Sequence, residues 1–271
     1  MNKRGESKKL KTKKKNAYPS FWSVLAVVIV LFLINTALKH SSGLGKNNSA
    51  EKTITEFASQ NGFTLDDYPP EIVEMLVLND ETENFVTNYP YKIQNFQPGN
   101  IDFSQYKDCT EPPTLMQWDM RWGYMQYNGN VMGLTGSAPT ALSMVAVYVL
   151  HNMSMTPVHI AEFSIGSNCE SRPEKLLSDG ARSLGMTVTE VPRNNNRLSQ
   201  AVKEKGSAVI CMMKSQEFSS FIVVKGVDED GNFLIIDPSN KKRSETHYSF
   251  SQLNTGIKRI WKYSTVSEDN P

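Results

Sequence analysis

The sequence predicts an α+β domain that follows a single membrane-spanning helix. Three observations predict it: an uncharged run over residues 21–38, a first half of the chain with apolar residues at helical spacing, and a second half with short runs rich in Val, Ile and Phe. Segregated helices and strands are typical of α+β folds. The chain has 271 residues, of which 39% are hydrophobic, enough to bury a substantial core.

The N-terminal segment predicts a membrane anchor. The run from Phe21 to Leu38 has no charged residue and is near the lower length limit for crossing a bilayer. Tyr18 and Trp22 suit the membrane interface, and the eight Lys/Arg before the run predict a cytoplasmic N-terminus. A cleaved signal peptide is the alternative, but the run is long for one and no small-x-small cleavage site follows. We therefore expect a cytoplasmic basic tail over residues 1–20, a single pass through the lipid bilayer of the cell membrane, and a main domain outside the cytoplasm.

Charge is distributed unevenly along the chain. Residues 1–46 carry ten Lys/Arg and one acidic residue, Glu6, whereas residues 47–271 carry 19 basic and 27 acidic residues. An acidic body argues against nucleic acid as a partner.

The histidines and cysteines do not predict a metal site. Their spacing does not match that of metal ligands, so we expect neither a metal nor a cofactor. Three cysteines allow one disulfide and one free thiol, and the pairing cannot be deduced from sequence. These residues are His40, His151, His159, His247, Cys109, Cys169 and Cys211.

The predicted elements follow from turn residues and periodicity. We expect a flexible stalk over 39–50, an N-terminal helical lead over 51–110, a main domain over 111–265 and a polar tail over 266–271. A helix is expected from Asp67 to Tyr89. Further helices are expected at 138–150, 157–165, 173–184 and 197–205, and strands at 207–213, 221–227, 232–236 and 258–263.

A glycine turn over residues 131–145 opens directly into a helix, with Ser137 at the junction and Pro139 just inside. A side chain at this junction faces unpaired N–H groups and the positive end of the helix dipole, which favour an anionic nucleophile such as a thiolate. Serine is also a preferred helix N-cap, worth about 1 kcal/mol. We expect Ser137 to cap the helix. A capping role explains a serine at this position without any catalytic function.

Seven motifs occur in an order that resembles one known family. They are the stretch from Tyr68-Pro69-Pro70-Glu71 through Asn79 to Val86 that ends at Tyr89-Pro90, Gln117-Trp118-Asp119-Met120-Arg121-Trp122-Gly123-Tyr124, Thr156-Pro157, Phe221-Ile222-Val223, the turn Asp230-Gly231, Asp237-Pro238 and Ile260-Trp261. Together they are similar to the membrane-anchored or secreted bacterial members of the papain-like cysteine peptidases related to bacteriocin-leader-processing peptidases. The resemblance implies a papain-like fold with a helical first half and an antiparallel sheet in the second.

The resemblance also implies a catalytic triad, and this chain departs from it at two positions. The family's Gly-Cys-Gly-Pro-Thr corresponds to Gly136-Ser137-Ala138-Pro139-Thr140, and its Gly-His-Phe-Ile-Val corresponds to Ser219-Ser220-Phe221-Ile222-Val223. The third member is present as Asp237, and Gln117 corresponds to a possible oxyanion donor, although it could equally hold the aromatic turn together. Ser220 cannot shuttle a proton near neutral pH as histidine does.

These substitutions predict a degenerate, non-catalytic peptidase-like protein of the bacterial cell envelope that binds a peptide or an envelope protein. One alternative is an active peptidase that uses Ser137 or a relocated thiol, with His247 as the least implausible substitute base. Among the thiols Cys169 is the hardest to exclude, because Cys109 has acidic neighbours and Cys211 lies in an apolar strand. A further alternative is a structural component of an envelope complex.

Overall fold

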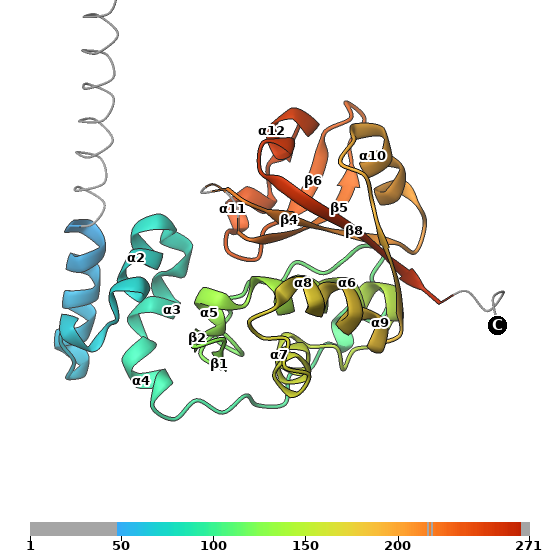
Figure 1. Ribbon diagram of the computed structural model, residues 1–271. Helices are drawn as coiled ribbons and strands as arrows, with labels where there is room; N and C mark the ends of the chain where they lie inside the picture. Colours follow the sequence, from blue (N-terminus) through green and yellow to red (C-terminus); the bar gives the residue numbers. More distant parts are fainter. Residues whose placement is uncertain (1–47, 216, 218, 267–271) are drawn as a thin grey trace, which may run out of the picture. The chain divides into compact units, whose positions relative to one another are not determined.

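The computed structural model describes residues 48–215, 217 and 219–266 (Figure 1). The chain divides into two compact units, Met1–Asn48 and Ser49–Pro271, and the fold described below is that of the second unit. Within the described part of the chain, every helix is too short or too polar to cross a bilayer. The run over residues 21–38 lies outside the described residues, so the anchor stays a prediction.

The N-terminal lead is helical but is broken into short pieces. The expected stalk lies mostly outside the described residues, and its last three residues belong to a helix over 48–61. The pieces that follow are η1 (Leu65–Asp67), α2 (Pro70–Leu78), η2 (Asp80–Thr82), α3 (Glu83–Thr87) and α4 (Tyr89–Ile93).

The single helix expected from Asp67 to Tyr89 is therefore wrong, and Asn79 shows why. Its backbone is extended (φ −148°), and its side chain accepts a hydrogen bond from the N–H of Glu81. The same side chain donates to the carbonyl of Ser239, 160 residues away, at 2.9 Å. A tertiary contact thus overrides the helical periodicity.

Phe85 anchors the lead to the main domain. Its ring stacks on Tyr124, with centroids 4.4 Å apart and planes 13° apart. Two glycines make room for it, because a Cβ on Gly123 or Gly133 would lie 2.7 or 2.5 Å from the ring. Tyr124 in turn donates from Oη to the carbonyl of Phe85 at 2.8 Å. The lead and the domain therefore share one buried core.

The first part of the main domain is mainly helical. Its longest helix, α6, is buried along nearly all of its length. After η3 (Ser104–Tyr106), near the end of the lead, the elements are β1 (Gln126–Tyr127), β2 (Asn130–Val131), α5 (Met132–Thr135), α6 (Ser137–Leu150), α7 (Pro157–Gly166), α8 (Pro173–Lys175), the π-helical η4 (Leu176–Gly180) and α9 (Ala181–Ser183).

The second part is an antiparallel six-stranded sheet in the order β3-β8-β4-β5-β6-β7. Its strands are β3 (Met186–Glu190), β4 (Ala208–Met213), β5 (Phe221–Val227), β6 (Phe233–Ile236), β7 (His247–Tyr248) and β8 (Ile257–Thr265), and its helices are α10 (Asn195–Lys203), α11 (Lys241–Ser244) and α12 (Phe250–Asn254).

The central strands are buried on both faces. On β4, Ala208 and Ile210 pack into the core that includes α6, whereas Val209 and Cys211 pack into the core that includes α10 and α12. Figure 1 shows α6 on one face of the sheet and α10 and α12 on the other. This arrangement confirms the predicted α+β class.

One strand of the sheet was not expected. Residues 186–190 form an edge strand, β3, that was not predicted, because the segment is short and mostly exposed. The last strand, β8, lies between β3 and β4.

The packing at Phe85 makes a testable prediction. Gly123→Ala places a Cβ 2.7 Å from the Phe85 ring and 2.9 Å from the carbonyl oxygen of Asp119, a backbone atom that cannot move freely. We expect a loss of about 1–3 kcal/mol in the free energy of unfolding, measured by urea denaturation. Gly99→Ala is the control, because its Cβ meets nothing within 4 Å. Equal stability of the two variants would contradict this account of the packing.

Candidate functional site

A cavity of about 270 Å³ brings together Ser137 and Ser220, the residues at two of the expected triad positions. Ser137, at the start of α6, and Ser220, just before β5, both line it. The other lining residues come from the β1–β2 hairpin, α5, α6, the loop after α7, α8 and β5: they are Tyr127, Asn128, Leu134, Thr135, Ala138, Glu170, Pro173 and Phe221.

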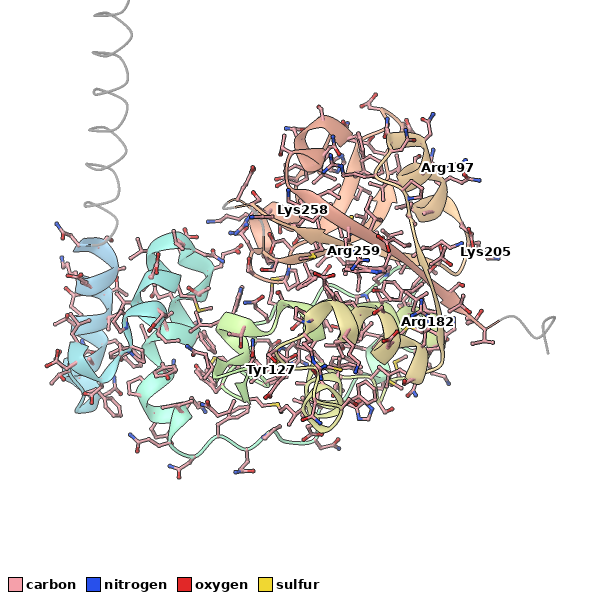
Figure 2. The ribbon with its side chains drawn as sticks, in the orientation of Figure 1. Tyr127, Arg182, Arg197, Lys205, Lys258 and Arg259 are labelled. Carbon is pink, nitrogen blue, oxygen red and sulfur yellow. The ribbon has the colours of Figure 1, made fainter. Side chains whose placement is uncertain are left out.

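Tyr127 forms a fixed part of the wall. Its phenol Oη lies 3.0 Å from Ser164 Oγ on α7, and Figure 2 labels Tyr127 in the helical part of the domain. Burial raises the pKa of Tyr127; the Ser164 hydrogen bond lowers it, and the charge of Glu170 raises it further. The phenol therefore stays neutral at physiological pH and provides an aromatic surface to the cavity.

Ser137 does not cap α6, contrary to the expectation. The cap position belongs to Gly136, and Ser137 is the first helical residue. A Cβ on Gly136 would lie 2.5 Å from the carbonyl oxygen of Met132, so the tight junction between α5 and α6 requires glycine there. Among the described residues no hydrogen-bond partner reaches the Ser137 hydroxyl. It is 9% exposed and faces the cavity.

Asp237 is fully buried and is held by an arginine. Arg243 Nη1 lies 3.0 Å from Asp237 Oδ2, with the arginine side chain only 26% exposed. The same carboxylate accepts from the backbone N–H of Ser219 at 3.2 Å, and from the N–H and hydroxyl of Ser239 at 2.9 and 2.8 Å. In an active relative this carboxylate orients a histidine; here a guanidinium compensates its charge.

The turn around Asp237 also binds the start of the main domain and the N-terminal lead. Gln117 donates its backbone N–H to the carbonyl of Pro238, and Trp118 donates from Nε1 to the carbonyl of Ser239. Glu81 accepts hydrogen bonds from the N–H groups of Lys241 and Lys242 at 2.7 and 3.1 Å. A carboxylate is favourable at the start of a helix such as α11.

The Gln117 side chain is directed at the backbone of the chain itself. Its Nε2 donates to the carbonyl of Gly133 at 2.7 Å and to that of Leu134 at 3.3 Å, and the residue does not line the cavity. In this arrangement the amide fixes α5, and its hydrogens are not directed at Ser137.

The described histidines do not line the cavity. His247 lies on β7, and its Nδ1 is 2.7 Å from a carboxylate oxygen of Asp228. His151 follows the last residue of α6, about 20 Å along the helix from Ser137, and His159 is exposed on α7. The imidazole of His247, considered above as a substitute base, is therefore hydrogen-bonded to Asp228 and lies outside the cavity.

All three cysteines are free thiols. Cys169 is buried, does not line the cavity, and donates weakly to the carbonyl of Ser167 at 3.4 Å. Burial raises the pKa of Cys211 to about 12, and burial also raises the pKa of the half-buried Cys109. A relocated thiolate nucleophile gains no support.

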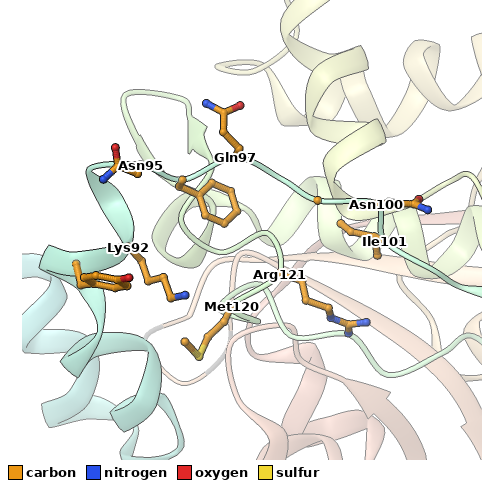
Figure 3. A pocket seen from close by; sticks show the side chains of 10 residues that line it. Lys92, Asn95, Gln97, Asn100, Ile101, Met120 and Arg121 are labelled. Atoms are coloured by element: carbon orange, nitrogen blue, oxygen red, sulfur yellow. The ribbon is translucent and has the colours of Figure 1, made fainter.

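A second, larger cavity of about 410 Å³ lies beside α4 and the turn that carries Met120 and Arg121 (Figure 3). Arg121 is paired with Asp119 and covers the Trp122 ring, 4.6 Å from its centroid. None of the site residues predicted from the sequence lines this cavity.

A comparison with family models identifies the class of the domain. Residues 134–261 match the model of the Peptidase C39 family. A domain of this peptidase family is therefore present, and its papain-like α+β fold agrees with the mixed helices and sheet. The match includes Ser137, Ser220 and Asp237 but not Gln117. None of the curated proteins and none of the solved structures compared with this chain gives a match.

Sequence reasoning missed two residues of this region, Arg243 and Glu170. Arg243 belongs to a polar segment of the sequence, Lys241-Lys242-Arg243-Ser244-Glu245. An aspartate directly after an apolar strand is a signal that could have found it, because a buried carboxylate requires a partner. No local signal marks Glu170, which reaches the cavity only through the loop between α7 and α8.

The Asp237–Arg243 pair makes a prediction about stability. Arg243→Leu leaves the buried carboxylate without its cation, and we expect a loss of about 3 kcal/mol in the free energy of unfolding. Adding Asp237→Asn should recover part of that loss, since the charge is then gone. The control is Lys241→Leu on the exposed side of α11, with an expected effect within about 0.5 kcal/mol. Similar losses in Arg243→Leu and the control would refute the pairing.

The thiols make a second prediction. Maleimide labelling of the folded protein near pH 7 should be slow and confined to Cys109, because burial lowers the thiolate fraction and Cys169 and Cys211 are covered. The rate should rise with pH, and Cys109→Ser should abolish labelling until the protein is unfolded. Rapid labelling of Cys169 in the folded Cys109→Ser variant, located by mass spectrometry, would restore the relocated-thiol alternative.

Proposed function

We propose that the C39-family domain binds a peptide segment in the cavity between Ser137 and Ser220 and does not cleave it. The observation that carries this proposal is the cavity itself, which is open between the start of α6 and the start of β5. If the domain served only as a scaffold, we would expect side chains to fill this space. The bound peptide could be a free chain or part of an envelope protein.

The chemistry of the site supports binding without catalysis. The two residues that activate and perform nucleophilic attack in the family are both serine here, and no described imidazole lines the cavity. In a serine protease, loss of the nucleophile or of the base costs about 10⁶ in kcat. Arg243 also forms an ion pair with Asp237, the carboxylate that would orient an imidazole.

The proposed location rests on the sequence. The uncharged run from Phe21 to Leu38, preceded by eight basic residues, supports a single-pass anchor with the domain on the outer side of the cell membrane. An extracytoplasmic peptide or envelope protein is the corresponding partner.

An active hydrolase is the second candidate, because Glu170 brings a carboxylate into the cavity that contains Ser137. A nucleophile and its base lie within hydrogen-bond reach in an organised site. No hydrogen bond joins these two described side chains, so binding is the better supported function.

The proposal predicts binding that a bulky side chain in the cavity blocks. Ser220→Trp should weaken the binding of capped fluorescent hexapeptide pools at least tenfold in fluorescence polarisation, because the indole fills the cavity. Ser251→Trp, on the exposed face of α12, is the matched control and should bind as the parent protein does.

Mass spectrometry of the same peptide pools tests the absence of catalysis. The peptides should be recovered intact after long incubation with the protein. Cleavage products that disappear in Ser137→Ala would establish the hydrolase and refute the proposed function.

A further inference from the structure

The loop between α7 and α8 presents one acidic side chain to the cavity. Among the described residues that line it, Glu170 is the only one with a formal charge. The loop is held in place on both sides of this residue: Cys169 is buried and donates its N–H to the carbonyl of Ser164 at 2.8 Å, and Arg172 donates its N–H to the carbonyl of Cys169 at 2.9 Å. The carboxylate is therefore displayed from a fixed backbone.

The Glu170 carboxylate has no cationic partner among the described residues. The nearest basic residue in sequence, Arg172, directs its guanidinium to the carbonyl of Asn168 through Nε at 3.0 Å and through Nη2. The acidic residue within α8, Glu174, is paired with Arg259 on β8. A half-buried carboxylate without a partner gains free energy when a cation binds beside it.

The rest of the wall suits the stem of a long side chain. Phe221, Pro173 and Leu134 provide apolar surface, and Tyr127 provides an aromatic ring of the kind that attracts cations. Lysine and arginine place their methylene stems along apolar surface and keep the charged head at a polar site. A volume of about 270 Å³ is below the ~300–1,000 Å³ typical of small-molecule pockets, which suits one peptide side chain.

We propose that this cavity selects peptide segments that carry a lysine or arginine side chain, whose charged head pairs with the carboxylate of Glu170. The inference rests on the proposed function, because it names the class of peptide that the same site takes. Ser137, Ser220 and Asn128 offer side-chain oxygens for further hydrogen bonds to the head or to the peptide backbone.

The test compares peptides that differ in one central charge. The probes are capped, fluorescent hexapeptide pools with a fixed central lysine, arginine, norleucine or glutamate, titrated against the full chain in detergent micelles. The lysine and arginine pools should bind at least about tenfold more tightly than the norleucine pool, which is the size expected for a charged hydrogen bond. Added salt should reduce the difference.

Glu170→Gln assigns the preference to this residue. The variant keeps the size of the side chain and removes its charge, so the lysine-to-norleucine affinity ratio should fall to near one. Glu162→Gln, on the exposed surface of α7, is the control and should keep the parent ratio. Circular dichroism of both variants checks that they are folded.

The outcomes separate this inference from the proposed function. Binding of the norleucine pool as tightly as the lysine pool, or a lysine preference that survives in Glu170→Gln, overturns the inference and leaves peptide binding intact. Failure of every pool to bind the parent protein overturns the proposed function, and the inference with it.

Discussion

The buried carboxylate of Asp237 is the constraint on which the site depends. A carboxylate with no solvent exposure must be compensated, and Arg243, the N–H of Ser219 and both donors of Ser239 compensate it. These bonds fix the backbone immediately before Ser220 and so define one side of the cavity. The adjoining turn also receives Gln117, and through Ser239 it binds the N-terminal lead.

If the domain is non-catalytic, as proposed, this arrangement explains how its scaffold persists. An aspartate whose only role is to orient a catalytic histidine has no such role when serine stands at the histidine position, as Ser220 does here. Here the guanidinium of Arg243 compensates the charge of the carboxylate, so Asp237 still contributes to the fold. The structure retains the walls of the site, and its serines leave the space between α6 and β5 open.

Local sequence patterns predicted the helices and strands well where burial of apolar side chains determines them. The helix after Gly136 and the strands β5 and β6 follow from glycine and apolar spacing, and all three form as expected. The break at Asn79 was not predictable, because its cause is a hydrogen bond to Ser239. The cavity and Glu170 were not predictable either, since the walls come from segments up to about ninety residues apart.

In the proposed function, peptides bind between α6 and β5 and are released without cleavage. Photocrosslinking tests this: a photoreactive version of the tightest-binding peptide is irradiated with the full chain, and the adduct is located by mass spectrometry. We expect intact peptide attached within residues 127–138, 170–173 or 220–221. A cleaved peptide, or adducts confined to other parts of the chain, would contradict it.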